Sequence, residues 1–131
     1  MTVITNERKN LVRLLTNARK SGLPVIHIRA EYNKDKSRWM PVWEELNLKS
    51  GKGHVDDVVP DCVCDFAAEL PGELIIAKNT FDGFLGTSLE EKLRELGIEK
   101  VYVSGMVTSC CVLFTAVTDY FFKSLTLQIL T

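Results

Sequence analysis

The stretch from residue 101 to residue 116 reads Val101-Tyr-Val-Ser-Gly-Met-Val-Thr-Ser-Cys-Cys-Val-Leu-Phe-Thr-Ala116. Its first residues are apolar with a β-branched bias, which predicts a short buried strand. Gly105 interrupts this run, and Thr108 has a side chain that can cap a following helix. The stretch therefore predicts a strand that turns directly into a helix.

Two adjacent cysteines lie at the start of this predicted helix. With Thr108 as the N-cap, Cys110 and Cys111 fall in the first turn, where backbone N–H groups lack intrahelical partners and the helix dipole is positive. That field favours thiolate over thiol, so the turn predicts a nucleophilic cysteine. The alternative is that two small apolar cysteines simply pack the helix against the sheet. Both interpretations are open at this point.

The rest of the chain alternates between the two hydrophobic periodicities. Helical spacing predicts a helix over 6–21, with Asn6 as its cap and Gly22 after its end, a weaker helix over 61–70, and a helix from 108 to about 123. Strands are predicted at 24–30, 73–77, 98–103 and 125–130. Thr87-Ser-Leu-Glu90 has the pattern of a capping box. It predicts a helix that buries Leu89, Leu93 and Leu96 and ends at Gly97.

Strands that alternate with helices predict βαβ units and a parallel sheet. With 131 residues and no repeat or linker, we expect a single α/β domain over 1–131. The net charge of -1 gives no electrostatic case for nucleic acid or an anionic membrane. No apolar run approaches a membrane span, and residues 1–20 are too charged for a signal peptide. The cysteines are thus expected to be reduced thiols in a cytoplasmic protein.

Several other residues are candidates for a site. Lys78 stands at the end of a predicted strand, where parallel sheets bind ligands, although a solvated strand-end charge is the alternative. The polar segment 31–57 carries Trp39 and Trp43, which either line a substrate site or pack beneath the loop. The four cysteines fit no usual zinc spacing, so no metal is expected.

The cysteine segment resembles the signature of the isochorismatase-like cysteine hydrolases, Gly-x-x-Thr-x-x-Cys-Val followed by Thr-Ala. Lys78-Asn-Thr-Phe-Asp-Gly-Phe84 resembles the lysine segment of that family, in which a phenylalanine follows six residues after the lysine. Gly22-Leu-Pro-Val-Ile-His-Ile-Arg29 resembles its second strand. The resemblance covers roughly residues 6 to 118.

The resemblance implies a three-layer αβα fold with a Rossmann-like parallel sheet and an Asp–Lys–Cys triad. It makes Cys111 the nucleophile and Lys78 the lysine that holds and polarises it. It implies a cis peptide and an oxyanion site around Met106, Val107 and Thr108, with Cys110 at a variable position. Phe84, Trp39 and Trp43 are then candidates for a substrate wall.

The function that the resemblance implies is hydrolysis of a small amide, a related C–N bond or an enol ether through a thioester intermediate. No cofactor is expected. The metal-binding Asp-x-His of some family members has no counterpart after Arg29. The partners implied are a small-molecule substrate and further copies of the chain in a homo-oligomer.

Two departures from the family pattern lead to further expectations. No aspartate ends a strand before the first helix, and neither Asp35 nor Asp82 matches that motif. The chain is also shorter than the pattern at both ends, so we expect a sheet that lacks the family's first, central strand and its last strand. Strands 24–30 and 98–103 would then pair directly, take up residues 2–5 as a stub, or leave the chain poorly folded. Hydrolysis would be impaired, and a truncated, non-catalytic binding or oligomerisation partner is the alternative.

Overall fold

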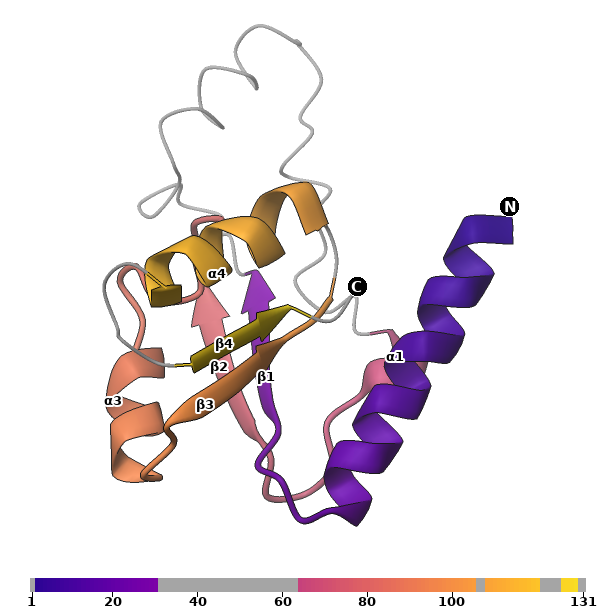
Figure 1. Ribbon diagram of the computed structural model, residues 1–131, viewed down its shortest axis with the longest axis horizontal. Helices are drawn as coiled ribbons and strands as arrows, with labels where there is room; N and C mark the ends of the chain where they lie inside the picture. Colours follow the sequence, from indigo (N-terminus) through magenta and orange to yellow (C-terminus); the bar gives the residue numbers. More distant parts are fainter. Residues whose placement is uncertain (1, 31–63, 106–107, 121–125, 130–131) are drawn as a thin grey trace, which may run out of the picture.

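The computed structural model describes residues 2–30, 64–105, 108–120 and 126–129 (Figure 1). The helical elements are α1 (Thr2–Lys20), the 3-10 turn η1 (Asp65–Ala67), α3 (Leu89–Glu95), the π-helical turn η2 (Thr108–Val112) and α4 (Leu113–Thr118). The strands are β1 (Ile26–Ala30), β2 (Leu74–Lys78), β3 (Lys100–Val103) and β4 (Thr126–Ile129). The predicted α/β class is confirmed, and the predicted strands 24–30, 73–77, 98–103 and 125–130 are all present with slightly different ends.

The strands form parallel pairs. In β1 and β2, Ile26 lies opposite Leu74 and Ala30 lies opposite Lys78. In β3 and β4, Lys100 lies opposite Thr126. Among the described residues these are two separate two-stranded sheets, because no described strand joins β1 to β3. Direct pairing of these two strands is therefore not the arrangement observed.

Helix α1 starts earlier than the sequence pattern predicted. It begins at Thr2 rather than after Asn6, so residues 2–5 belong to a helix and the expected strand stub is wrong. Once a helix has formed, each further residue adds a hydrogen bond, which outweighs the weak helix preference of β-branched residues. The end agrees with the prediction, since α1 stops at Lys20 and Gly22 has a φ of 67°.

The start of α3 differs from the predicted capping box. Its N-cap is Ser88 rather than Thr87. The Thr87 hydroxyl donates to the Gly83 carbonyl oxygen at 2.6 Å and accepts the Leu89 N–H at 3.2 Å. Because this hydroxyl is tied to the preceding turn, the helix begins one residue later than a box would place it.

The predicted burial of α3 is correct for two of its three leucines. Leu89 and Leu93 are buried, whereas Leu96, at 47% exposure, is not. The helix ends before Gly97, whose φ is 63°, as predicted.

Two other helical predictions are only partly met. The weak helix expected over 61–70 is reduced to the turn η1, and residues 61–63 lie outside the described chain. The helix expected from 108 to about 123 begins as a π-helical turn and continues as α4, while residues 121–125 also lie outside it.

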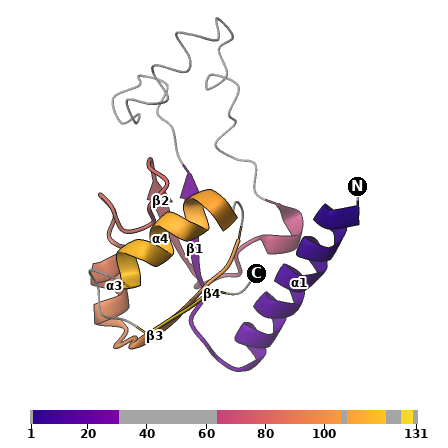
Figure 2. The same cartoon turned by 45° about the horizontal axis from the view of Figure 1, so that its top comes forward.

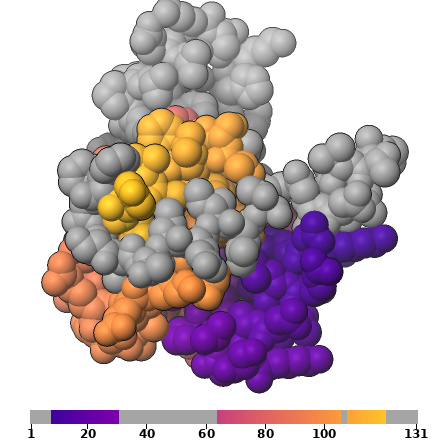
Figure 3. All heavy atoms as spheres, viewed as in Figure 1, coloured from indigo at the N-terminus to yellow at the C-terminus, as the bar shows by residue number. Residues whose placement is uncertain are grey.

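The elements are layered around one apolar cluster. In both ribbon views α3 and α1 lie on opposite sides of the strands (Figures 1 and 2), and α4 crosses the C-terminal ends of β1 and β2. In the space-filling view α4 lies on the front face (Figure 3). The cluster joins β2, α3 and the segment between them, and both strand pairs pack on it. Its residues are Ile76, Phe84, Leu89 and Leu93, with Ile26, Ile28, Ile98 and Val101 at its edge. No described helix is both long and apolar enough to cross a membrane.

Candidate active site

Lys78 is the last residue of β2, and its side chain is almost completely buried. Its exposed fraction is 6%. The Nζ atom donates to the carbonyl oxygen of Thr80 at 2.7 Å and to the Sγ atom of Cys111 at 3.2 Å. A buried ammonium group is stable only when such partners replace water. The structure thus brings together the two residues that the sequence identified as the centre of a site.

Cys111 lies in the turn η2 that follows β3. Between them Gly105 has a φ of 142°, a backbone conformation that glycine adopts without a Cβ clash. Thr108 is the first residue of η2 rather than the cap of an α-helix. The cysteines nevertheless lie in the first helical turn, where backbone N–H groups lack helical acceptors. Single π-helical turns are frequent at functional sites.

The two adjacent cysteines have different surroundings. Burial raises the pKa of the Cys110 thiol, and the neighbouring Cys111 raises it further, while Lys78 acts in the opposite direction. Cys110 therefore favours the neutral thiol. Cys111 instead accepts a hydrogen bond from Lys78 Nζ, so its sulfur is the one that lies against the cation.

The segment after Lys78 is fastened to α4 by hydrogen bonds. The Gly83 N–H donates to Thr115 Oγ1 at 2.8 Å. The Thr118 hydroxyl donates to Asp82 Oδ2 at 2.6 Å, and Asp82 Oδ1 accepts the Phe84 N–H at 2.8 Å. Gly83 is at a close approach, since a Cβ there would lie 3.1 Å from the Thr115 side chain. These contacts join the segment that follows Lys78 to the helix that follows Cys111.

The site holds no carboxylate next to the Lys–Cys pair within the described residues. Both oxygens of Asp82 accept hydrogen bonds from other groups. Asp119 is completely buried, and neither of its oxygens has a hydrogen-bond partner. Desolvation raises the pKa of Asp119, so the neutral acid is favoured there. The sequence pattern did not identify Asp119, although it follows four residues after the buried Thr115 and so lies on the inward face of the helix.

The other predicted site residues have varied positions. Phe84 packs in the apolar cluster with an exposed fraction of 7%, which accounts for it as a core residue. Met106, Val107, Trp39 and Trp43 lie outside the described residues. In the described part of the chain, no group of three His, Cys, Asp or Glu side chains is placed to hold a metal ion.

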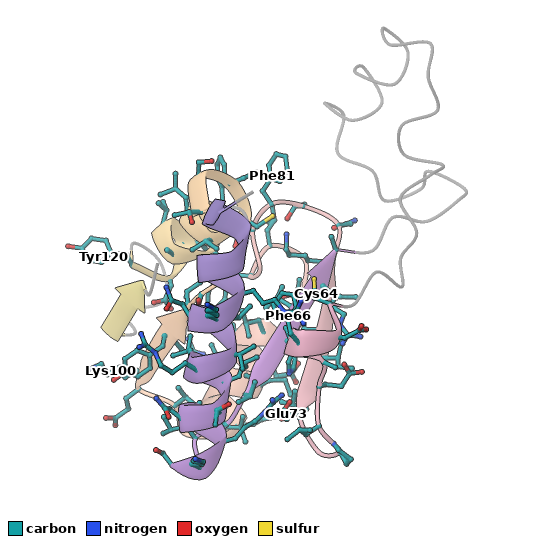
Figure 4. The ribbon with its side chains drawn as sticks, turned by 90° about the vertical axis from the view of Figure 1, so that its right-hand side faces the viewer. Cys64, Phe66, Glu73, Phe81, Lys100 and Tyr120 are labelled. Atoms are coloured by element: carbon teal, nitrogen blue, oxygen red, sulfur yellow. The ribbon has the colours of Figure 1, made fainter. Side chains whose placement is uncertain are left out.

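A second polar cluster lies at the other end of the β1–β2 pair. Glu73 Oε1 and Oε2 accept from Arg19 Nε and Nη2 at 2.8 and 2.9 Å. Its Oε2 atom also lies 2.8 Å from His27 Nε2 and accepts the Leu70 N–H at 2.8 Å. Figure 4 shows Glu73 and Phe81, which follows Lys78 closely in the chain, toward opposite ends of the molecule.

The pKa of Glu73 lies well below its usual range. The hydrogen bonds from Arg19 are the largest cause, and desolvation of the carboxylate acts in the opposite direction. His27, in β1, is a partner of this carboxylate. The nearby Arg29 forms an ion pair with Glu69. This cluster joins α1 to the strands through compensated charges.

Parallel strands, a helix across their C-terminal ends and a buried Lys–Cys pair define an α/β protein with a cysteine-centred site. The chain belongs to the isochorismatase domain family, which it matches over residues 4–121. The similarity covers both the lysine and the cysteine segments.

Curated relatives include ureidoacrylate amidohydrolase RutB of Yersinia enterocolitica, which is 29% identical over 131 residues, covering 87% of this chain and 55% of the relative. An uncharacterized isochorismatase family protein, PncA of Bacillus subtilis, is 42% identical over 50 residues, covering 38% of this chain and 27% of the relative. The chain spans about half the length of the RutB relatives it matches.

Solved structures agree with the fold. An isochorismatase family protein from Desulfovibrio vulgaris has a TM-score of 0.82 and 26% identity, with 95% of this chain and 65% of that chain covered. N-carbamoylsarcosine amidase from Thermoplasma acidophilum has a TM-score of 0.72 and 23% identity, with 95% and 69% covered. The second likeness shows a shared fold.

Proposed function

We propose that this chain is a cysteine hydrolase that cleaves a C–N bond in a small carbamoyl or ureido compound, with Cys111 as the nucleophile. The observation that carries the proposal is the 3.2 Å contact between Lys78 Nζ and Cys111 Sγ. A cysteine needs a base or a cation beside it to attack a carbonyl carbon, and the buried lysine supplies that cation.

The reaction begins when the Cys111 thiolate adds to the substrate carbonyl carbon and a C–S bond forms. The carbonyl oxygen becomes an oxyanion, which the N–H groups at the start of η2 would stabilise. The C–N bond then breaks, and the leaving nitrogen takes a proton from the Lys78 ammonium. A thioester remains on Cys111. Water hydrolyses it, its proton returns to Lys78, and the carboxylic or carbamic acid leaves the free thiolate.

The substrate class follows from the site and from one relative. A thiolate attacks an electrophilic carbonyl carbon, such as that of an amide or a ureido group. The RutB relative, at 29% identity, is named as an amidohydrolase of ureidoacrylate, and this supports a ureido group as the first candidate. A simple amide or an enol ether is the broader class to which the same nucleophile applies.

Turnover should be slow in this chain. Among the described residues no carboxylate touches Lys78 or Cys111, and in the proposed reaction the lysine carries both proton transfers. Absence of a positioned general base typically costs about 10²–10⁴-fold in rate. We therefore expect the thioester to form more readily than it is hydrolysed.

The test is to incubate the chain with a ureido acid such as N-carbamoyl-β-alanine and to record ammonia release and intact mass. We expect slow ammonia release and an acyl adduct on Cys111. Cys110→Ala should retain both signals, whereas Cys111→Ala should lose them. Equal ammonia release by Cys111→Ala would exclude the proposed nucleophile.

A non-catalytic binding role is the second candidate, and it is favoured by the lack of a carboxylate contact to Lys78 or Cys111 within the described residues. The same experiment separates the two functions. A chain that binds the ureido acid saturably, as measured by calorimetry, yet forms no adduct and releases no ammonia would be a binding protein rather than a hydrolase.

A further inference from the structure

The segment that follows Lys78 forms a turn held together by its own side chains. The Thr80 hydroxyl donates to the Asp82 carbonyl oxygen at 3.0 Å and accepts the Asp82 N–H at 3.2 Å. Asp82 Oδ1 in turn accepts the Phe84 N–H at 2.8 Å. Local side-chain bonds of this kind give a turn a defined backbone shape. We call residues 79–84 the lysine turn.

The lysine turn supplies a partner of the Lys78 ammonium. Nζ donates to the Thr80 carbonyl oxygen at 2.7 Å and to Cys111 Sγ at 3.2 Å. A lysine side chain is a flexible four-carbon stem, so its partners rather than its own shape determine where the charge lies. A displacement of the Thr80 carbonyl would therefore move the ammonium relative to the sulfur.

Hydrogen bonds tie the lysine turn to α4, the helix that continues directly from η2. The Thr118 hydroxyl donates to Asp82 Oδ2 at 2.6 Å, and the Gly83 N–H donates to Thr115 Oγ1 at 2.8 Å. Because η2 carries Cys111, these bonds connect the lysine turn to the element that bears the sulfur.

The bond between Thr118 and Asp82 is the strongest of these connections. It ends on a carboxylate, and hydrogen bonds to charged groups are shorter and about twice as strong as neutral ones. Its length of 2.6 Å is typical of that class. The stacked rings of Phe81 and Phe114, with centroids 5.9 Å apart, add a less directional contact. Figure 4 shows Phe81 at the end of the molecule where α4 lies.

We propose that Asp82 and Thr118 are positioning residues for the proposed reaction. Their hydrogen bond holds the lysine turn on α4 and so keeps the Lys78 ammonium against Cys111 Sγ. The proposal rests on the proposed function in taking Cys111 as the nucleophile. Asp82 has no part in proton transfer, since both of its oxygens already accept hydrogen bonds. It acts through the Thr80 carbonyl group, which the lysine turn places.

A purely structural role for this hydrogen bond has different consequences. A bond that only stabilised α4 would, when lost, lower the free energy of unfolding and leave the chemistry of the folded protein unchanged. A bond that positions the ammonium would, when lost, slow the reactions of Cys111 in the folded protein. That slowing would also require Lys78 to be present. A reactivity measurement on folded protein therefore separates the two roles.

The test measures the rate at which iodoacetamide labels each cysteine at neutral pH, read by peptide mapping. Thr118→Val removes the hydroxyl group and keeps the branched shape. We expect it to slow the labelling of Cys111 by about threefold or more, because the ammonium is no longer held at the sulfur. Thr118→Ser, which keeps the hydroxyl group, should label at nearly the wild-type rate.

The matched control is Thr16→Val. It removes a hydroxyl group that donates to the Val12 carbonyl oxygen at 2.7 Å within α1, away from the lysine turn. The same change of side chain should there leave the labelling of Cys111 unchanged.

A double variant determines whether the effect passes through the lysine. In a Lys78→Met background Thr118→Val should slow the labelling of Cys111 no further, because no ammonium is left to position. Equal slowing with and without Lys78, or a wild-type labelling rate in Thr118→Val, would overturn the proposal.

Asp82 provides a second disruption if circular dichroism shows that Thr118→Val does not fold. Asp82→Ala removes the acceptor and should slow the labelling of Cys111 in the same way. Asp82→Asn should keep most of the rate, since the Thr118 hydroxyl can either donate to or accept from an amide. An Asp82→Asn variant as slow as Asp82→Ala would assign the effect to charge and overturn the proposal, as would a wild-type rate in Asp82→Ala.

Ammonia release from the ureido acid is recorded separately on the same variants. A wild-type chain that releases no ammonia, but whose labelling depends on Thr118 and Lys78 as described, would exclude the proposed hydrolysis and support the positioning of the ammonium.

Discussion

The β1–β2 pair carries charged side chains at both ends, but the two ends handle them differently. At the start of the strands Glu73 is paired with Arg19 and bonded to His27. At their C-terminal end Lys78 is buried beside a sulfur atom and a carbonyl oxygen. At the first end the Glu73 carboxylate faces the Arg19 cation. At the second end the Lys78 cation faces the Cys111 thiol, which carries a charge only when it has lost its proton.

This difference separates a structural charge cluster from a reactive one. A carboxylate bound by a guanidinium gains stability and loses basicity, as the lowered pKa of Glu73 shows. A thiol beside an ammonium can lose its proton and attack a carbonyl. The same strands can therefore be anchored at one end and reactive at the other.

The largest expected effect comes from breaking the structural end. Glu73→Gln should lower the free energy of unfolding by about 3 kcal/mol, because it leaves a partly buried guanidinium without its carboxylate. Urea denaturation measures the change. Glu95→Gln is the control, since the Lys92–Glu95 pair is exposed and should contribute little to stability. Equal losses in the two variants would contradict a special role for Glu73.

The same variant should change the acid limb of the stability profile. The folded pKa of Glu73 is lower than its unfolded value, so its stabilisation is complete above about pH 4.3 and is lost as the pH falls toward the lowered value. Unfolding of the wild type should therefore become easier over that range, and Glu73→Gln should show a flatter profile.

The next effect sharpens the reactive end. Lys78→Met should reduce the rate of iodoacetamide labelling of Cys111 at neutral pH by about tenfold or more, because the thiolate loses its charge-assisted hydrogen bond. Urea denaturation records any accompanying loss of stability, since removing one partner of a buried pair leaves the other without its compensating group. Peptide mapping gives the rate at each cysteine. Lys100→Met, which removes a lysine that lies over the Tyr102 ring, should leave labelling unchanged.

A smaller effect is expected where the segment after β2 meets α4. Gly83→Ala should cost about 1–2 kcal/mol of stability, because its Cβ would lie 3.1 Å from Thr115. Thermal unfolding measures the loss. Adding Thr115→Ser removes the crowded methyl group and keeps the hydroxyl, so the double variant should regain part of the stability. A double variant that is less stable than the sum of both changes would rule out this crowding.

The smallest effect concerns Asp119. Its folded pKa is raised by burial, so it opposes folding as the pH rises from about 3.9 toward the raised value. Asp119→Asn should remove that fall in stability, which has a limiting slope of about 1.4 kcal/mol per pH unit. Chemical denaturation between acid and neutral pH, compared with wild type, measures it. Parallel profiles for the two proteins would show that burial does not raise the pKa of Asp119 on folding.

The features that the sequence predicted are those that depend on neighbouring residues. Gly22 and Gly97 ended their helices as expected because a positive φ is a local requirement. Lys78 and Cys111 were identified because the end of one strand and the start of one helix are both readable from short patterns. Lys78 Nζ and Cys111 Sγ lie 3.2 Å apart, so the two patterns meet at one place in the fold.

The features that were missed depend on contacts distant in sequence. The capping box failed because Thr87 bonds to the turn at Gly83 rather than to its own helix alone. Glu73 and its partner Arg19 are 54 residues apart, and no local pattern connects them. The isolation of Asp119 follows from how α4 is buried, which spacing alone does not specify.

Sequence separation also determines when each end of the β1–β2 pair can assemble during synthesis. Arg19, His27 and Glu73 are all present once residue 73 has emerged from the ribosome. Lys78 must wait for a cysteine 33 residues further on, and Gly83 waits 32 residues for Thr115. The anchoring contacts around Glu73 are thus available first. Cys111 can meet Lys78 only later, when β2, which positions Lys78, can already be in place.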